Sequence, residues 1–136
     1  MLNDAARAAI ESGRLAHLTT LNADGSPQTT VVWTGLDGDA LVIASLDDRA
    51  KVRNVRRDPR VSLSMETDGV THGLPNYLVV EGTAEVVEGG AFEWLQHLAP
   101  RYLGPDATFP PESLRAPGFR IVITPFRVRG MGPWDS

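Results

Sequence analysis

The chain has 136 residues, and its 13 lysine and arginine side chains against 17 aspartates and glutamates give a formal net charge of −4. This length predicts one domain over residues 1–136, with a core that needs no metal or disulfide. The absence of cysteine excludes disulfides, thiolate metal sites and a cysteine nucleophile. The acidic balance argues against nucleic acid as a partner.

Membrane insertion and secretion find no support in the sequence. No apolar run approaches the roughly 20 residues that a membrane helix needs. The first residues, MLNDAARAAIESG, carry acidic side chains and lack the long apolar stretch of a secretory signal, so the expected location is the cytoplasm. The three histidines lack the spacing of a metal site, and we expect no bound metal.

The first part of the chain predicts a helix followed by short strands. Alanines and Ile10 recur at helical spacing over residues 4–12, with Asn3 or Asp4 as the cap. Asp-Gly turns then separate three apolar, β-branched stretches typical of an antiparallel meander. These stretches are residues 15–21, 28–34 and 41–45. Residues 28–34 are apolar or neutral on both faces, which predicts a central strand that is buried on both sides.

The second part predicts two more helices and longer strands. The first of these helices lies within residues 47–57 and ends at Asp58-Pro59, and the second spans residues 91–103. The expected strands are residues 60–66, 77–87, 119–124 and 127–130. A turn at Asp68-Gly69 and a loop through Pro75 separate the first two of these strands. The small residues Gly82 and Ala84 indicate close approach by a neighbour. Six or seven local strands predict a small, mainly β, antiparallel barrel with helical plugs.

The basic side chains are concentrated in one segment. Six of the 13 lie within residues 49–60, namely Arg49, Lys51, Arg53, Arg56, Arg57 and Arg60. At helical spacing, one face carries Arg49, Arg53, Arg56 and Arg60, while Val52 and Val55 lie opposite with Lys51 beside them. Lys51 is the only lysine of the chain. Guanidinium groups together with one ammonium suit the oxygens of a phosphate, and the net charge of −4 favours a small phosphorylated ligand over a polyanion.

Neighbouring strands offer further polar groups for such a ligand. Ser45 ends one strand and offers a hydroxyl donor, and Gln28, Thr29 and Thr30 lie on the strand before it. An elongated ligand with a phosphate tail and a flat head would fit across these strands. Neither a hydrolase elbow, a P-loop nor a dinucleotide-binding glycine motif is present.

Several segments resemble one known family. The runs R-L-A-H-L-T-T-L-N-A-D-G-S-P-Q over 14–28 and R-A-K-V-R-N-V-R-R-D-P-R-V over 49–61 resemble the pyridoxamine 5′-phosphate oxidase-like FMN-binding split-barrel superfamily. The similarity is greatest to its branch of probable coenzyme F420-dependent enzymes, the flavin/deazaflavin oxidoreductases of actinobacteria. Y-L-V-V-E-G-T-A-E over 77–85 and the C-terminal Gly132-Pro-Trp134 also match that branch.

The resemblance implies a homodimer of six-stranded split barrels with two cofactor sites at the subunit interface. By the same resemblance Arg49 and Lys51 hold the cofactor phosphate, Ser45 donates to it and Asn54 fixes the local backbone. The strand from Gln28 to Trp33 lies along the ring system, where backbone groups of Thr29, Thr30 and Val31 meet the heterocycle. Trp33, Tyr77 and Trp134 are expected at the cofactor, or in core or dimer packing.

The implied chemistry is hydride transfer from reduced F420 to a small organic acceptor, such as an activated double bond. No side chain stands out as a proton donor. Because F420 continues past its phosphate into a lactyl-glutamate tail, arginines such as Arg53, Arg56 or Arg57 are expected to meet the tail carboxylates. Two alternatives stay open: an FMN-binding flavoprotein of the same fold, and a non-catalytic carrier of a cofactor or haem.

Overall fold

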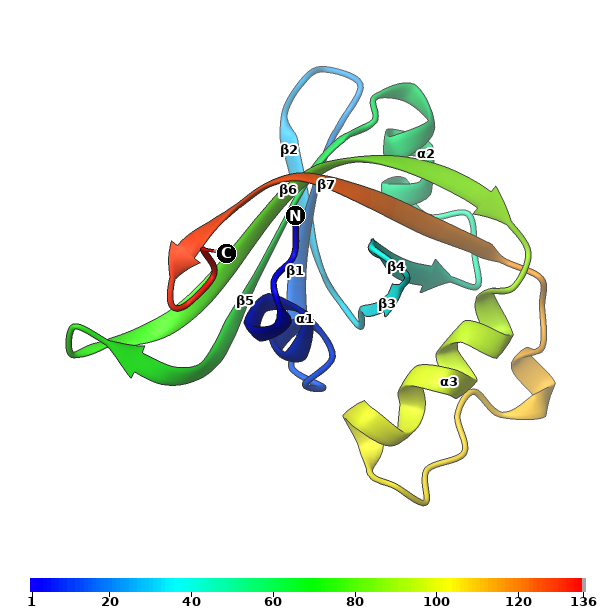
Figure 1. The fold of residues 1–136 in the computed structure, drawn as a ribbon. Helices are drawn as coiled ribbons and strands as arrows, with labels where there is room; N and C mark the ends of the chain where they lie inside the picture. Colours follow the sequence, from blue (N-terminus) through cyan, green and yellow to red (C-terminus); the bar gives the residue numbers. More distant parts are fainter. Residues whose placement is uncertain (136) are drawn as a thin grey trace.

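The computed structural model describes residues 1–135 as an antiparallel sheet with helices packed around it (Figure 1). The strands are β1 (Ala16–Leu21), β2 (Pro27–Val32), β3 (Gly35–Asp37), β4 (Ala40–Ser45), β5 (Arg60–Thr71), β6 (Leu74–Glu88) and β7 (Phe119–Met131). The helices are α1 (Asp4–Ile10), α2 (Ala50–Arg57) and α3 (Ala91–Leu103), with one 3₁₀ turn at Glu112–Leu114.

The sheet is a split barrel. Its strand order is β2-β1-β5-β6-β7-β4-β3, so β2 and β3 are its two edges. These edges are consecutive in the chain and are joined by Trp33 and Thr34 alone. The mainly β barrel is thus confirmed. The expectation of six strands is wrong, because within residues 1–135 the short β3 pairs with β4 and makes seven.

The expected central position of residues 28–34 is also wrong. Strand β2 pairs only with β1, and the side chain of Val31 is 56% exposed. Its second apolar face therefore does not pack in the core. Val31 lines a groove instead, together with Val32 and Trp33 at the end of the strand. An edge strand beside a groove has the same two-faced apolar pattern as a central strand.

Strands β5 and β6 form one long hairpin that extends away from the rest of the molecule (Figure 1). The expected turn at Asp68-Gly69 and loop through Pro75 are wrong. The chain turns at His72 and Gly73, which both have positive φ, 53° and 80°. A register shift between Glu66 and Val70 absorbs Gly69 into the strand. An Asp-Gly pair can mark a bulge as well as a turn.

The alternation of apolar residues on β5 and their helical spacing on α2 correctly predicted which side chains enter the core. Val61, Leu63 and Met65 on β5 are buried, while Val52 and Val55 anchor α2. Gly82 is closely approached, as expected: a Cβ there would lie 2.5 Å from the carbonyl oxygen of Thr124 on β7. The core cluster fills the inside of the curled sheet, and α1 packs against it through Ala6 and Ile10.

The helix boundaries agree with their sequence signals. Asn3 caps α1 by accepting a hydrogen bond from the Ala6 N–H at 2.9 Å, and α2 stops before Asp58. Helix α3 spans residues 91–103 as expected. No helix within residues 1–135 combines the length and apolar character needed to cross a membrane.

Candidate functional site

A groove of about 600 Å³ opens at the split of the barrel. Its walls come from the end of β2, the end of β4 with the connection to α2, and helix α3 with the loop after it. The lining residues are Val31, Val32, Trp33, Ala44, Ser45, Leu46, Asp47, Arg49, Lys51, Leu95, Phe109, Leu114 and Ala116. Its charged side chains, Asp47, Arg49 and Lys51, all belong to the β4–α2 segment, so the groove has one charged end and otherwise mostly apolar walls.

Lys51 is the unusual cation of this protein. Every arginine pairs with a carboxylate or donates to a carbonyl oxygen, whereas Lys51 has no such partner among residues 1–135. Its side chain is half-buried, and this burial, followed by the charge of Arg49, lowers the pKa of the ammonium. A half-buried cation without a counter-charge is stabilised by any anion that enters the groove.

The start of α2 adds to this positive potential. Arg49 is its N-cap, no side chain bonds to the cap, and the first turn has no acidic residue. The N-terminal end of a helix carries a partial positive charge that favours anions. Lys51 and the beginning of α2 therefore act on the same end of the groove.

Ser45 lies in the groove, but its hydroxyl is already engaged. The Oγ donates to the carbonyl oxygen of Asp47 at 2.6 Å. The carboxylate of Asp47 in turn accepts a bond from Arg49, with 3.5 Å between Oδ2 and Nη2. To donate to a ligand, the Ser45 hydroxyl would therefore have to break its hydrogen bond to the Asp47 carbonyl oxygen.

An aromatic stack forms the opposite wall. The Trp33 indole lies parallel to the Tyr102 ring, with 4.8 Å between centroids and 4° between planes. Phe109 lies against the same indole at 5.5 Å with a tilt of 59°. Because Trp33 is held by two other rings, its position in the groove is well defined.

Tyr102 also holds the connection between the two sheet edges. Its hydroxyl donates to the carbonyl oxygen of Thr34 at 3.0 Å and accepts from the Thr34 N–H at 2.9 Å. Thr34 has left β2 and has not yet joined β3, so Tyr102 takes the place of a strand neighbour. Burial raises the pKa of the Tyr102 phenol, which keeps its proton available for this bond.

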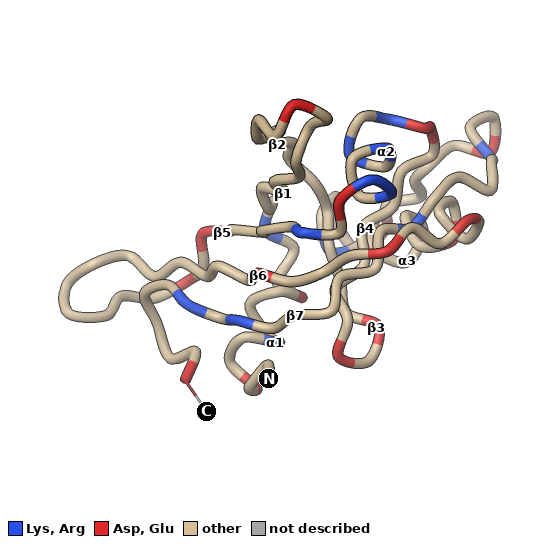
Figure 2. Tube along the Cα trace, turned by 90° about the horizontal axis from the view of Figure 1, so that it is seen from above, with Lys and Arg blue, Asp and Glu red and all other residues tan. Residues whose placement is uncertain are grey.

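The remaining arginines of the basic segment do not line the groove, although Figure 2 shows that lysine and arginine positions are concentrated around α2. Arg53 donates to the carbonyl oxygen of Asp48 at 2.6 Å, and Arg56 lies 3.4 Å from Glu88. Arg57 donates to the carbonyl oxygen of Leu21 at 3.0 Å. These side chains bind other parts of the protein.

Asn54 is buried and connects α2 to β1 and to the turn that follows it. Its Nδ2 donates to Thr20 Oγ1 and to Asn22 Oδ1, each at 3.0 Å, and its Oδ1 accepts from Arg57 at 2.6 Å. Each polar group is partnered, so the network fixes the position of the helix that carries Lys51.

The polar residues of β2 lie outside the groove lining. Gln28 accepts a bond from Thr20 at 3.2 Å, and Thr29 Oγ1 lies 3.1 Å from Thr19 Oγ1. The Oγ1 of Thr30 is buried and has no hydrogen-bond partner among the described residues. Of the residues expected along this strand, Val31 and Trp33 line the groove.

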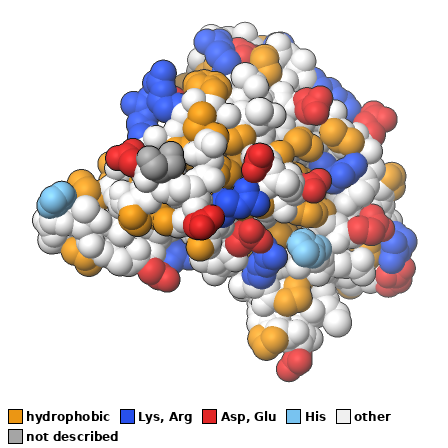
Figure 3. Space-filling view, viewed as in Figure 1, with side chains coloured by type: hydrophobic (Ala, Val, Ile, Leu, Met, Phe, Trp, Pro, Cys, Tyr) orange, Lys and Arg blue, Asp and Glu red, His pale blue; other side chains and the backbone are white. Residues whose placement is uncertain are grey.

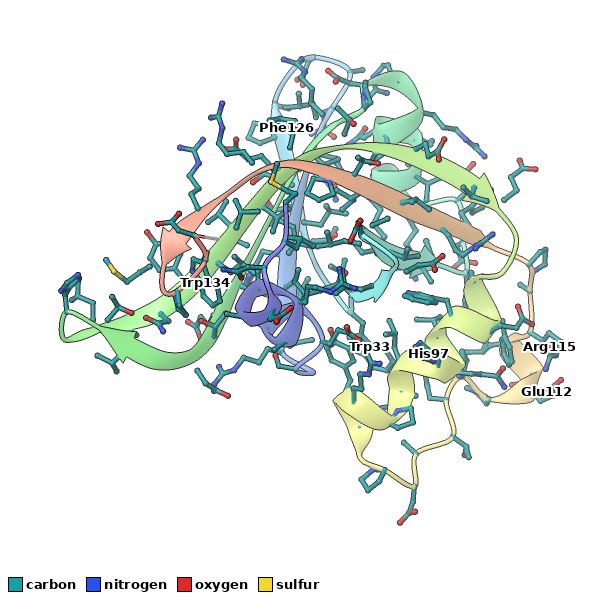
Figure 4. The ribbon with its side chains drawn as sticks, in the orientation of Figure 1. Trp33, His97, Glu112, Arg115, Phe126 and Trp134 are labelled. Carbon is teal, nitrogen blue, oxygen red and sulfur yellow. The ribbon has the colours of Figure 1, made fainter. Side chains whose placement is uncertain are left out.

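Tyr77 and Trp134 belong to another part of the protomer. Trp134 Nε1 donates to the carbonyl oxygen of Tyr77 at 2.8 Å. Figure 4 shows Trp134 near the β5–β6 hairpin, on the other side of α1 from Trp33. Tyr77 is 47% exposed, whereas Trp134 is buried. Neither contributes to the groove of its own chain.

No metal centre is found among residues 1–135, since no three histidine, cysteine or acidic side chains converge. The histidines lie apart, on β1, at the tip of the hairpin and on α3, and none lines the groove. Acidic and basic side chains lie next to one another on the face drawn in Figure 3.

Sequence reasoning missed the far wall and one charged residue of the groove. Leu95, Phe109, Leu114 and Ala116 come from α3 and the loop that follows it, and Asp47 comes from the turn before α2. A phenylalanine within the polar, proline-rich loop was a visible signal, because such a loop has few reasons to contain a large apolar ring. No comparable signal distinguished Asp47 from Asp48.

Comparison with known proteins supports the resemblance seen in the sequence. Residues 2–132 match the pyridoxamine 5′-phosphate oxidase family. A structure described as an F420 reductase is 30% identical, with a TM-score of 0.73, and the match covers 90% of this chain and 94% of that one. A conserved hypothetical protein of Mycobacterium tuberculosis, Rv2991, is 27% identical with a TM-score of 0.74, covering 96% and 85% of the two chains.

A haem-binding protein of Mycobacterium smegmatis shares the fold, with 23% identity and a TM-score of 0.65 over 93% of this chain and 52% of that one. At that identity the likeness concerns the fold alone. The match over residues 2–132, the split barrel and the resemblance of the basic segment lead to one conclusion. The chain belongs to the pyridoxamine 5′-phosphate oxidase family.

Proposed function

We propose that this protein is an F420H2-dependent oxidoreductase: a single split-barrel domain over residues 1–136 that binds the deazaflavin in the groove and transfers hydride to a small organic acceptor. The observation that carries the proposal is Lys51, a half-buried cation that pairs with no carboxylate, at the charged end of a groove of about 600 Å³. The 30% identical structure described as an F420 reductase gives the proposal its cofactor.

The groove residues fit a phosphorylated, flat cofactor. Arg49 and Lys51 would hold the phosphate, next to the start of α2. Val31 and Trp33 offer an apolar surface for a ring system, and Leu95 and Phe109 exclude water from the opposite side. When bound, the deazaflavin supplies the hydride, and the chain supplies binding and orientation.

The groove assigns no proton donor. Its titratable side chains among the described residues are Asp47, Arg49 and Lys51, which all come from the phosphate end. The walls around Trp33 and Phe109 are otherwise apolar. In this proposal the proton that follows the hydride comes from solvent, and the protein determines only where the acceptor lies.

The proposal includes a homodimer with cofactor sites at its interface. Tyr77 lies away from the groove of its own chain, yet it is 47% exposed. A second copy would bring its Tyr77 to the groove, and its Trp134 would support that residue through the bond to the Tyr77 carbonyl oxygen. Gln28, Thr29 and Thr30 would then contact the cofactor through the backbone of β2.

The test is equilibrium binding of F420 and FMN to the apo protein, followed by fluorescence. Lys51→Ala is expected to weaken F420 binding by about tenfold or more, because a charge-assisted bond to the phosphate is lost. Arg60→Ala is the control, since Arg60 pairs with Asp58 outside the groove. Unchanged F420 affinity in Lys51→Ala would refute the phosphate assignment.

An FMN-binding flavoprotein is the second candidate, and one observation favours it. Arg53, Arg56 and Arg57 bind other groups of the protein, so they do not stand ready for the carboxylates of the F420 tail. A clear preference of the apo protein for FMN would therefore select this candidate. Turnover of F420H2 with a panel of enones and quinones separates an enzyme from a carrier.

A further inference from the structure

The charged end of the groove contains one carboxylate in addition to its two cations. Asp47 lines the groove together with Arg49 and Lys51, and its Oδ2 lies 3.5 Å from Arg49 Nη2. The neighbouring Asp48 is oriented differently: it lies outside the groove lining and 3.9 Å from Arg53. The groove therefore presents two positive charges and one negative charge to a ligand.

A carboxylate at this position opposes the binding of an anion. It competes with a phosphate for the Arg49 guanidinium, and it repels the phosphate directly. Both side chains of the pair are largely exposed, 68% for Arg49 and 73% for Asp47, so their contact gives little stability to the fold. The main effect of Asp47 is on the charge that a ligand meets.

We propose that Asp47 is a specificity-determining residue that lowers the net charge of the phosphate site to +1, and so disfavours the dianion of a phosphomonoester relative to the monoanion of a phosphodiester. The inference rests on the proposed function, because it takes the groove as the phosphate site. FMN carries a monoester, whose second pKa is about 6, and F420 carries a diester. Asp47 thereby favours F420 over FMN.

Electrostatics gives this proposal a quantitative signature. The repulsion between Asp47 and a phosphate is proportional to the charge of the phosphate. Removing the carboxylate charge raises the affinity for a monoanion by some factor. Because the repulsion of a dianion is twice as large, the affinity for a dianion rises by the square of that factor. For charges a few ångströms apart in a water-like medium we expect about fourfold for a monoanion and about fifteenfold for a dianion.

The experiment uses two probes that differ in one methyl group and one charge: FMN, and riboflavin 5′-(methyl phosphate), its phosphodiester. Their dissociation constants are measured for the wild-type protein, Asp47→Asn and Asp48→Asn, slightly above neutral pH and at low salt. Asp47→Asn is expected to strengthen FMN binding about fourfold more than ester binding. Asp48→Asn is the matched control and should change both affinities less than Asp47→Asn does, because Asp48 lies outside the groove lining.

Each outcome has a separate meaning. An equal change of both affinities in Asp47→Asn, or no change, overturns the role of Asp47. A similar effect in Asp48→Asn overturns it as well, because the effect is then one of general surface charge. Failure of both flavin probes to bind also overturns the inference. Binding of F420 in the titration described above tests the proposed function separately.

Discussion

Lys51 favours a bound anion and destabilises the protein when no anion is bound. Its half-buried ammonium has lost part of its hydration, and Arg49 repels it, which is why its pKa is lowered. Such a residue is seldom retained for the stability of the fold, since an apolar side chain would pack there at lower cost. For the same reasons, a bound phosphate would stabilise the protein mainly through its contact with Lys51.

The lowered pKa predicts a pH dependence of stability. On raising the pH, the folded state loses the Lys51 proton before the unfolded state does, so the unfolded state binds more protons and stability rises. This contribution grows from the lowered pKa up to the ordinary lysine pKa. Lys51→Met is therefore expected to stabilise the apo protein at neutral pH and to lose this advantage at alkaline pH.

Urea unfolding of the wild-type protein and of Lys51→Met, at neutral and at alkaline pH, measures the difference in unfolding free energy between the two proteins. Comparing the two proteins at each pH removes the contributions of groups that lie away from Lys51. A variant that is less stable than the wild type by the same amount at both pH values would contradict the prediction.

At the level of elements, the connection between the edges of the barrel depends on α3. Tyr102 on this helix satisfies both backbone groups of Thr34 and stacks on Trp33. Periodicity was sufficient to predict α3 over 91–103, because one face of an amphipathic helix follows from local spacing alone. The partner of that face was not predictable, since Thr34 and Tyr102 are 68 positions apart in the sequence.

Tyr102→Phe tests this role. It keeps the ring against Trp33 but leaves the N–H and carbonyl of Thr34 without a partner, at an expected loss of about 1 to 3 kcal/mol of unfolding free energy. Trp33 fluorescence should change with the lost restraint, and F420 binding should weaken. For the stability measurement the matched control is Tyr77→Phe, which removes the other phenolic hydroxyl. Equal stability of Tyr102→Phe and the wild type would show that Thr34 does not depend on the hydroxyl.

The same contrast explains which parts of the site were predictable. Arg49, Lys51 and Ser45 were found because they lie close together in the sequence and share a chemical character. The positions of Arg53, Arg56 and Arg57 were not, because the acidic and carbonyl groups that bind them come from different elements. The basic segment shows how much positive charge is present, whereas the fold determines how much of it a ligand meets.

On the scale of the whole molecule, the proposed dimer would cover apolar side chains that are exposed on the strands. Val31 on β2 and Tyr77 on β6 are 56% and 47% exposed, and Phe126 on β7 is 53% exposed. These apolar side chains lie on strands rather than in loops. Short loops were sufficient to predict hairpin pairs such as β1–β2 and β5–β6, but not that the consecutive strands β2 and β3 are the two edges of the sheet. The sequence also contains no local signal for which face meets a second copy.

A homodimer predicts a solution mass of twice the chain mass by light scattering. Within it, Tyr77→Ala should weaken F420 binding on the order of tenfold, because it removes an aromatic contact that the second copy contributes. Thr83→Ala, exposed on the same strand, is the control. A monomeric protein that binds F420 as tightly in Tyr77→Ala as in the wild type would refute the interface site.

The split of the barrel also determines how the molecule opens. Strands β5, β6 and β7 form the long continuous ladders, whereas β2 and β3 each have one neighbour. The connection between the two edges is held by Tyr102, whereas Asn54 ties helix α2 to β1, the one neighbour of β2. Amide hydrogens of β2 and β3 should therefore exchange with solvent by local opening, while those of β6 exchange only when the whole chain unfolds. A ligand that spans the groove would slow the exchange of amides in β2 and β3 and, at low occupancy, leave the exchange of amides in β6 almost unchanged. Exchange rates would therefore report ligand binding strand by strand.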